Sequence, residues 1–268
     1  MHSSWPVDHH VHTRWSLDIP EGPTFEDYIP LVEQEHIHVN FLDHLEIALF
    51  NDNVPLKEST IANYLEAFDV AKSRCNHISK GFEVDYYPDK ETAIAEFLDN
   101  YKKDVDFVVG SVHEIAPFQA VTVPMHLQNL LQRNSFDELV QRYFEYERKM
   151  VKSGLFNAIA HPDVIFRFCG DMVENLPSYE MHPLLSDLAN LCKERNVSVE
   201  LNVRGLLYPC KRSFPSIKMA RQFRDRGVKM FVGSDSHSVQ DLIRQLKWIK
   251  EANLFVQGKI TRKNWDFD

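Results

Sequence analysis

Residues 228–234, VKMFVGS, form a short and mostly apolar run, and Asp235, Ser236 and His237 follow it directly. Near-continuous apolar runs of this length are typical of parallel strands that are buried on both faces. Six further runs of the same kind precede it, at 6–11, 38–43, 78–85, 106–112, 156–160 and 197–203. Stretches with apolar residues at helical spacing lie between them. This alternation predicts an α/β protein whose parallel sheet is either closed into a barrel or open and doubly wound.

Two sequence signals predict where helices begin and end. Ser135 and Glu138 have the spacing of a capping box, which opens a helix that we expect to end at Gly154. A later helix, at about 216–226, is expected to end at Gly227 for the same reason. Residues 114–134 are expected to be a long loop, and loops of that length often act as lids.

The overall composition is that of an ordinary globular protein. The chain has 268 residues, of which 44% are hydrophobic and 26% charged, which excludes a disordered or fibrous protein. No low-complexity linker or shift in composition divides it, so we expect a single domain over residues 1–268. The 39 acidic residues outnumber the 30 basic ones by nine, and this excess argues against long nucleic acids or anionic membranes as partners.

The cysteines and the N-terminal residues bear on the compartment. Cys75, Cys169, Cys192 and Cys210 form no Cys-x-x-Cys pair, which is typical of a reduced, cytoplasmic protein. The first residues, MHSSWPVDHHVHT, have neither the basic nor the apolar region of a signal peptide. No apolar run approaches the length of about 18 residues that a membrane span needs.

Side chains that can bind metals follow six of the seven predicted strands. In chain order they are His10 and His12, with Asp18 six residues later, then His44, Glu83, His113, His161, Asp235 and His237. The carboxyl ends of parallel strands meet at one face, where active sites of α/β proteins are built. Imidazole with carboxylate suits zinc, manganese or iron(II). These side chains are too many for one ion, so we expect two or three ions that share a bridging carboxylate.

These side chains lie in short motifs: Asp8-x-His10-x-His12, Glu83, Gly110-Ser111-Val112-His113, Ala160-His161-Pro162 and Gly233-Ser234-Asp235-Ser236-His237. Together the motifs resemble those of the polymerase-and-histidinol-phosphatase (PHP) family. Within that family the chain is most similar to the histidinol-phosphate phosphatases. The likeness runs from about residue 6 to residue 237. It implies a distorted (β/α)7 barrel with the active site at the carboxyl ends of the strands.

The resemblance also implies a site for three divalent transition-metal ions (zinc, manganese or iron). By motif position, His10, His12, Glu83 and Asp235 would hold the first ion. Glu83 would bridge to a second ion, which His113 and His161 complete, and Asp18, His44 and His237 would hold the third. Three dications and three carboxylates leave a net charge of about +3, which would attract a phosphate dianion in spite of the acidic chain.

The implied activity is hydrolysis of a small phosphate monoester, with histidinol phosphate of histidine biosynthesis as the candidate substrate. A hydroxide that bridges two ions would attack phosphorus, and Asp235 or His237 would protonate the leaving group. Family members carry basic residues that bind the phosphate after two of the strands. Here Arg167 and Arg204 could do so, although Leu207 stands where the family pattern predicts arginine.

Three alternatives remain open from the residues. The first is a PHP-type phosphodiesterase that acts on small nucleotides. The second is an amidohydrolase-like metal hydrolase, which also begins with His-x-His on a barrel strand; the proposed bridge here is Glu83 and not a lysine, which argues against it. The third is a metal-binding or regulatory module without catalysis. The sequence does not indicate the oligomeric state.

Overall fold

A computed structural model describes residues 5–44, 58–169 and 183–260. Its centre is a sheet of seven parallel strands that pair in chain order, with every neighbouring pair parallel. The strands are β1 (Val7–Val11), β2 (His38–His44), β3 (Ile78–Asp85), β4 (Phe107–Ser111), β5 (Ala158–Ile159), β6 (Ser198–Asn202) and β7 (Met230–Gly233). Each predicted run therefore contains or overlaps one strand.

Hydrogen bonds between the first and last strands close this sheet into a barrel. The backbone N–H of Asp235 donates to the carbonyl of His10 (2.7 Å), and that of His12 donates to the carbonyl of Ser236 (2.9 Å). Val11 and Ser236 form a parallel bridge at the same place. Of the two architectures that the β–α alternation allowed, the closed (β/α)7 barrel is confirmed.

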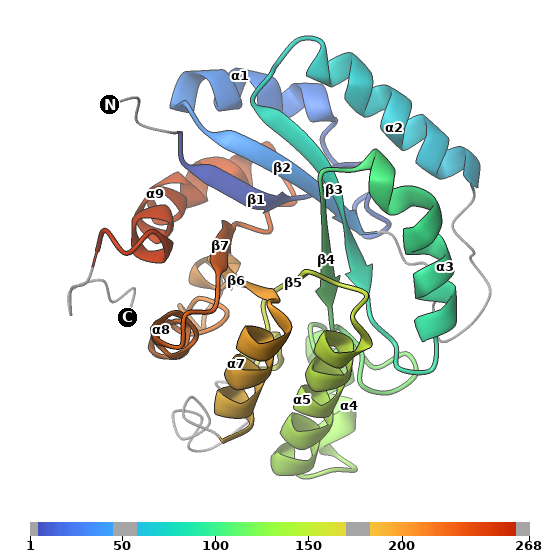
Figure 1. Ribbon diagram of the computed structural model, residues 1–268, viewed down its shortest axis with the longest axis vertical. Coiled ribbons are helices and arrows are strands. Elements are labelled where there is room, and N and C mark those ends of the chain that lie inside the picture. The colour runs from blue at the N-terminus through green and yellow to red at the C-terminus, as the bar shows by residue number, and fades with distance from the viewer. Residues whose placement is uncertain (1–4, 45–57, 170–182, 261–268) are drawn as a thin grey trace.

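Helices surround the strands on the outside (Figure 1). They are α1 (Phe25–Glu35), α2 (Glu58–Lys72), α3 (Glu91–Tyr101), α4 (Pro124–Leu131), α5 (Phe136–Ser153), α7 (Pro183–Arg195), α8 (Ile217–Asp225) and α9 (Val239–Val256), with short 3₁₀ turns at Lys102–Asp104, Val164–Phe166 and Arg204–Leu207. Within the described ranges, none of these helices is both long and apolar enough to cross a membrane.

The predicted helix boundaries are confirmed. Ser135 and Glu138 form a reciprocal capping box at the start of α5, and each accepts a backbone hydrogen bond from the other. Gly154 and Gly227, with φ of 74° and 73°, take the left-handed conformation that suits glycine after a helix.

The expectation of a loop over residues 114–134 is wrong in part, because the segment contains α4. Pro124 occupies the first turn of this helix, where the missing N–H costs nothing. Leu127 and Leu130 lie three residues apart on one face and are buried, which supplies the packing that stabilises so short a helix. The irregular parts are therefore residues 114–123 before α4 and the short turn at 132–134 after it.

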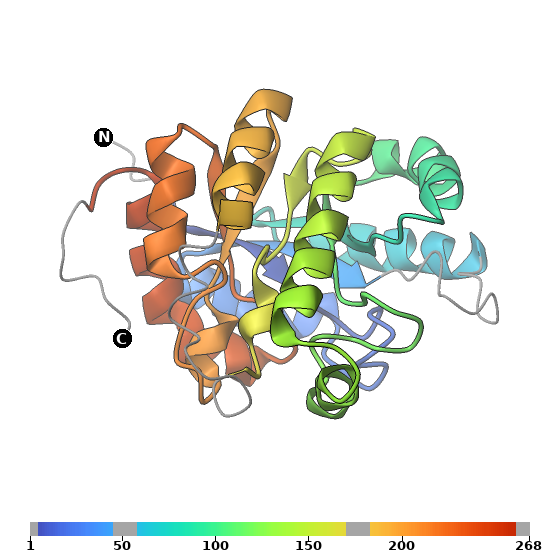
Figure 2. The same cartoon turned by 90° about the horizontal axis from the view of Figure 1, so that it is seen from below.

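The apolar core has two parts. A large cluster joins the strands to the surrounding helices. A smaller one comes from β2, β4, β5 and β7, and because these strands lie on different sides of the barrel, its side chains fill the interior: Leu42, Val109, Ala158, Ala160 and Phe231. In parallel barrels the carboxyl ends of the strands lie on one face. Figure 2 shows α5 (yellow-green) and α7 (orange) next to each other on the outside of the strands.

Candidate metal centre

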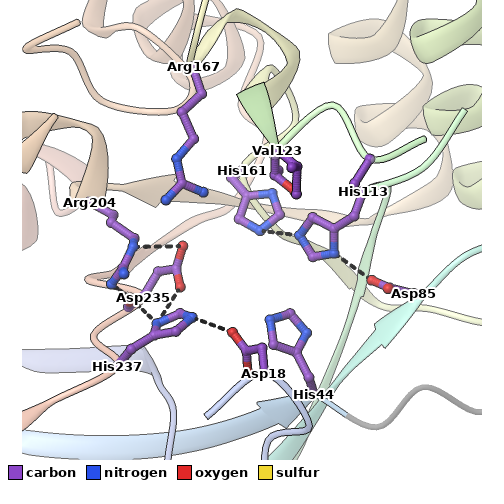
Figure 3. A pocket seen from close by; sticks show the side chains of 12 residues that line it. Asp18, His44, Asp85, His113, Val123, His161, Arg167, Arg204, Asp235 and His237 are labelled. Atoms are coloured by element: carbon purple, nitrogen blue, oxygen red, sulfur yellow. Dashed lines mark hydrogen bonds and ion pairs between the residues drawn. The ribbon is translucent and has the colours of Figure 1, made fainter. Parts of the chain in front are cut away.

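A pocket of about 400 Å³ opens at the carboxyl ends of the strands. Its wall combines imidazoles, carboxylates and two guanidinium groups, with a few small or apolar side chains on one side (Figure 3). The residues that line it are Asp18, His44, Asp85, His113, Ala120, Thr122, Val123, His161, Arg167, Arg204, Asp235 and His237. His10, His12 and Glu83 lie buried among these groups. The structure thus brings together all of the side chains that the sequence indicated.

Glu83 on β3 is the centre of the cluster. Its Oε2 lies 2.9 Å from His10 Nε2 and 3.3 Å from His44 Nδ1, whereas its Oε1 lies 3.0 Å from His161 Nε2 and 3.6 Å from His113 Nε2. The two oxygens of one carboxylate therefore face two different pairs of imidazoles. This is the arrangement that a bridging carboxylate requires.

A second group of contacts lies beside Glu83. His12 Nε2 is 3.1 Å from Asp235 Oδ1, and the same carboxylate oxygen is 3.4 Å from His237 Nδ1. His237 Nε2 in turn lies 2.9 Å from Asp18 Oδ2. Asp18 reaches this group from the loop after β1, so the group joins the two strands that close the barrel.

The donor atoms fit divalent transition metals. Among the described residues, three groups of three have ligand atoms within 4.8 Å of one another: His12, His44 and His237; His10, His12 and Glu83; and His44, Glu83 and His113. Because the groups share members, they form one continuous centre. Imidazole nitrogen with carboxylate oxygen is the donor set that zinc and related ions prefer.

Outer hydrogen bonds aim the imidazoles at this centre. Glu200 accepts from His10 Nδ1 (2.7 Å), and Asp85 accepts from His113 Nδ1 (2.6 Å). A carboxylate can only accept, so each of these Nδ1 atoms carries a proton, and each Nε2 would offer its lone pair to a bound cation in place of a second proton. Ser16 holds His12 Nδ1 in a similar way, at 3.1 Å.

Sequence reasoning did not assign these orienting residues. Asp85 follows Glu83 by two residues, and Glu200 precedes Asn202 by two, so strand alternation is the signal that could have indicated the side of the strand on which each lies. The partner of each is an imidazole on another strand. Only the register between strands shows which pairs meet.

The charges of the cluster depend on one another. Burial alone would lower the pKa of His10, but Glu200 and Glu83 outweigh it and raise that pKa well above its usual value. Burial alone would raise the pKa of Glu83, but His44 and His10 hold it well below its usual value. Asp85 likewise outweighs burial and raises the pKa of His113 to about 10. The carboxylates thus stabilise positive charge on the neighbouring imidazoles, and bound cations would supply that charge in place of protons.

Two backbone features shape the centre. His161 and Asp235 have positive φ angles of 24° and 52°, which non-glycine residues seldom adopt and which often mark functional sites. Gly233 is required for a different reason, since a Cβ there would lie 1.8 Å from Glu200 Oε1 and 2.6 Å from His10 Cβ. The contact between Glu200 and His10 therefore depends on a glycine on the neighbouring strand.

Arg167 and Arg204 both extend into the pocket (Figure 3). Both donate to the hydroxyl of Tyr208, Arg204 through Nε at 3.0 Å. Arg204 also lies 4.0 Å from Asp235 and 3.7 Å from Asp241. In contrast, no carboxylate of the described residues lies within 4.0 Å of the Arg167 guanidinium, whose Nε is buried without a hydrogen-bond partner.

Comparison with known proteins identifies the family. Residues 8–204 match the profile of the PHP domain. The chain belongs to the PHP family. A Deinococcus radiodurans relative that carries the name histidinol-phosphatase is 26% identical over 59% of this chain, and the match spans 56% of that relative's length. The histidinol-phosphatase of Bacillus subtilis is 24% identical over 88% of this chain and 94% of its own length.

Solved structures of PHP proteins share the barrel. A Listeria monocytogenes protein named as a histidinol phosphatase superimposes with a TM-score of 0.80, at 21% identity, over 90% of this chain and 99% of its own. The histidinol phosphate phosphatase of Lactococcus lactis, solved with zinc, L-histidinol and phosphate, has a TM-score of 0.70 and 17% identity, over 93% of this chain and 94% of its own. At these identities, the likeness establishes the fold.

Proposed function

We propose that this PHP protein is a metal-dependent phosphatase that hydrolyses small phosphate monoesters, and that histidinol phosphate is the first substrate to test. The observation that carries the proposal is the meeting of two arginines with a cluster of imidazoles and carboxylates in one pocket. The names of the relatives, and the zinc, histidinol and phosphate bound in the Lactococcus lactis protein, support the same substrate class.

The proposed centre holds three divalent ions in three overlapping groups of ligands. His10, His12, Glu83 and Asp235 would hold one, Glu83, His113 and His161 the second, and Asp18, His44 and His237 the third. The contacts of both Glu83 oxygens support its place between the first two ions. Bound cations would act as Lewis acids and would lower the pKa of a coordinated water from about 15.7 toward about 7.

The protein's own side chains would bind and orient the phosphate. Arg167 has hydrogen-bond donors in the pocket and no carboxylate partner within 4.0 Å among the described residues, so an anionic oxygen would satisfy it. Arg204, in the 3₁₀ turn that follows β6, would also donate to the phosphate, while Asp241 keeps its guanidinium in place. A proton for the leaving oxygen would come from Asp235 or His237, both of which line the pocket.

The test is turnover of a panel of phosphate monoesters and diesters, including histidinol phosphate and small nucleotides, by protein that has been reconstituted with Zn²⁺ or Mn²⁺. Removal of a charge-assisted contact to phosphate should lower kcat/KM about 10- to 150-fold in Arg167→Ala and in Arg204→Ala, with metal content unchanged. Arg226→Ala is the matched control, because Arg226 bonds Asn190 and Ser186 away from the pocket. Hydrolysis of diesters but of no monoester would overturn the proposal.

A further inference from the structure

The loop after β6 holds a tyrosine beside the two arginines of the pocket. Tyr208 directly follows the 3₁₀ turn Arg204–Leu207. Its backbone N–H donates to the carbonyl of Gly205 (3.1 Å), and its carbonyl accepts from the N–H of Lys211 (3.1 Å). Pro209 comes next and favours an extended backbone in the residue before it, which Tyr208 adopts with φ of −91° and ψ of 168°. The backbone thus fixes the point from which the Tyr208 ring extends.

The hydroxyl of Tyr208 accepts hydrogen bonds from both guanidinium groups. Arg204 donates through Nε at 3.0 Å, and Arg167 donates through Nη2. A hydroxyl oxygen has two lone pairs, so one oxygen serves both donors at once. The Arg167 guanidinium also lies over the Tyr208 ring, 4.1 Å from its centre, where the ring face attracts a cation. Tyr208 therefore contacts both of the residues that we assign to phosphate.

The two arginines are not anchored equally. Arg204 is also held from a second side, because its Nη1 donates to the backbone carbonyl of Asp235 and lies 3.7 Å from Asp241 Oδ2 on α9. For Arg167, the hydroxyl of Tyr208 is the one hydrogen-bond acceptor that the described residues offer to the guanidinium, whose Nε is buried without a partner. The contacts thus run from α9 through Arg204 and Tyr208 to Arg167, whose orientation depends on them.

The acceptor between the arginines is neutral. A carboxylate in the same place would also orient the two guanidinium groups, but its negative charge would offset one of theirs and repel an anion. Without any acceptor, the two like charges would repel each other and separate. A hydroxyl avoids both effects, because its oxygen attracts the N–H donors and leaves both arginines with their full positive charge. The pocket thus keeps two cationic side chains in its wall (Figure 3).

We infer that Tyr208 is a positioning residue, which holds Arg167 and Arg204 together in the orientation that binds the phosphate of the substrate. This inference rests on the proposed phosphatase function. Long side chains that must be ordered on binding lower the affinity, so arginines that are held in place beforehand bind an anion more tightly. The pair also compensates for Leu207, which stands where the family pattern predicts arginine. Arg204 supplies a guanidinium group from the same turn, and Tyr208 holds that group in place.

The test uses protein reconstituted with Zn²⁺ and measures binding of inorganic phosphate by isothermal titration calorimetry. Tyr208→Phe keeps the ring under Arg167 and removes only the hydroxyl oxygen. It should weaken phosphate binding about tenfold, because both arginines lose their shared acceptor and must be ordered on binding. For the best phosphate monoester of the panel, KM should rise by about the same factor while kcat changes less than about twofold, as expected for binding that the ground state and the transition state share. Metal content should be unchanged, because Tyr208 is not among the proposed ligands.

A double-mutant cycle separates positioning from a general structural role. Arg167→Ala is compared with the double variant Tyr208→Phe/Arg167→Ala. If Tyr208 acts through Arg167, most of its effect vanishes once that guanidinium is absent, so the second substitution should weaken phosphate binding less than about threefold further. A structural role would instead give the same factor, about tenfold, in both backgrounds.

Tyr146→Phe is the matched control. Tyr146, on α5, is half-buried like Tyr208, has the Lys149 ammonium group 5.9 Å from its ring centre, and does not line the pocket. Its replacement should leave phosphate binding and KM unchanged.

The outcomes separate the inference from the proposed function. Wild-type phosphate affinity in Tyr208→Phe, or an equal loss with and without Arg167, would overturn the inference while hydrolysis by the wild type upholds the function. A wild type that binds phosphate with the expected coupling but hydrolyses no monoester would overturn the function and leave Tyr208 as the organiser of a phosphate-binding site. Absence of phosphate binding in the wild type would overturn both.

Discussion

Replacement of Glu200 by glutamine is a sharp test of how the metal centre is organised. Glu200 is fully buried on β6 and does not belong to the proposed ligands. Its Oε1 accepts from His10 Nδ1 (2.7 Å), and its Oε2 accepts from the backbone N–H of His161 (2.8 Å). Both oxygens therefore hold residues that we assign to different ions.

Glutamine retains the shape but cannot satisfy both contacts. It has one carbonyl oxygen and one NH₂ group, so one of the two donors would face another donor. If the NH₂ group faces His10, the imidazole loses the acceptor that keeps its proton on Nδ1 and leaves Nε2 free. Loss of such an orienting partner typically lowers metal affinity about 10- to 100-fold, which corresponds to about 1.4–2.7 kcal/mol.

The assay is competition for Zn²⁺ between the metal-free protein and a chromophoric chelator, for the wild type and for Glu200→Gln. The matched control is Glu147→Gln. Glu147 is equally buried, on α5, and accepts only from Tyr143 (2.9 Å) among the hydrogen bonds that the described residues show for its carboxyl group. We expect weaker binding in Glu200→Gln alone. Wild-type affinity in Glu200→Gln, or an equal loss in the control, would refute the role of Glu200.

Three further predictions concern the ions and the buried acids. Glu83→Gln should lose at least one ion and nearly all turnover while its circular dichroism spectrum is unchanged, and a wild-type rate would rule out the bridge. Reconstituted wild type should contain close to three ions per chain by elemental analysis, whereas one ion or none would contradict the three-ion centre. Burial raises the pKa of Glu147 well above its usual 4.5, so the folded chain keeps a proton there that the unfolded chain releases. The free energy of unfolding of the wild type should therefore fall from pH 5 to pH 8 relative to Glu147→Gln, as urea titrations in the presence of a chelator would show, and equal pH dependence would refute it.

Much of the barrel could be predicted from the sequence, because each strand is a local feature. The run at 228–234 contains β7, and the runs at 6–11 and 78–85 contain β1 and β3. Likewise the side chains after the strands could be expected to meet, since parallel strands that follow one another through helices place their carboxyl ends on one face. The helix caps at Ser135 and Gly154 were predictable for the same reason of locality.

The short helix α4 was not predictable from the local pattern. Its eight residues are too few for a convincing helical repeat, and its stability comes from the burial of Leu127 and Leu130. The helix therefore depends on what the rest of the molecule packs against it.

The sequence by itself determined the class of the fold, the set of imidazole and carboxylate side chains that meet in the pocket, and the face on which they lie. Only the tertiary structure decided that the barrel closes between β1 and β7, that Glu200 and Asp85 hold His10 and His113, and that Tyr208 joins the two arginines. Glu200 and His10 are 190 residues apart, and their contact depends on strand register and on the missing side chain of Gly233. The patterns that predict strands and helices depend on residues that are close together along the chain. Hydrogen bonds between strands depend instead on strand register and on atomic positions to within about a few tenths of an ångström.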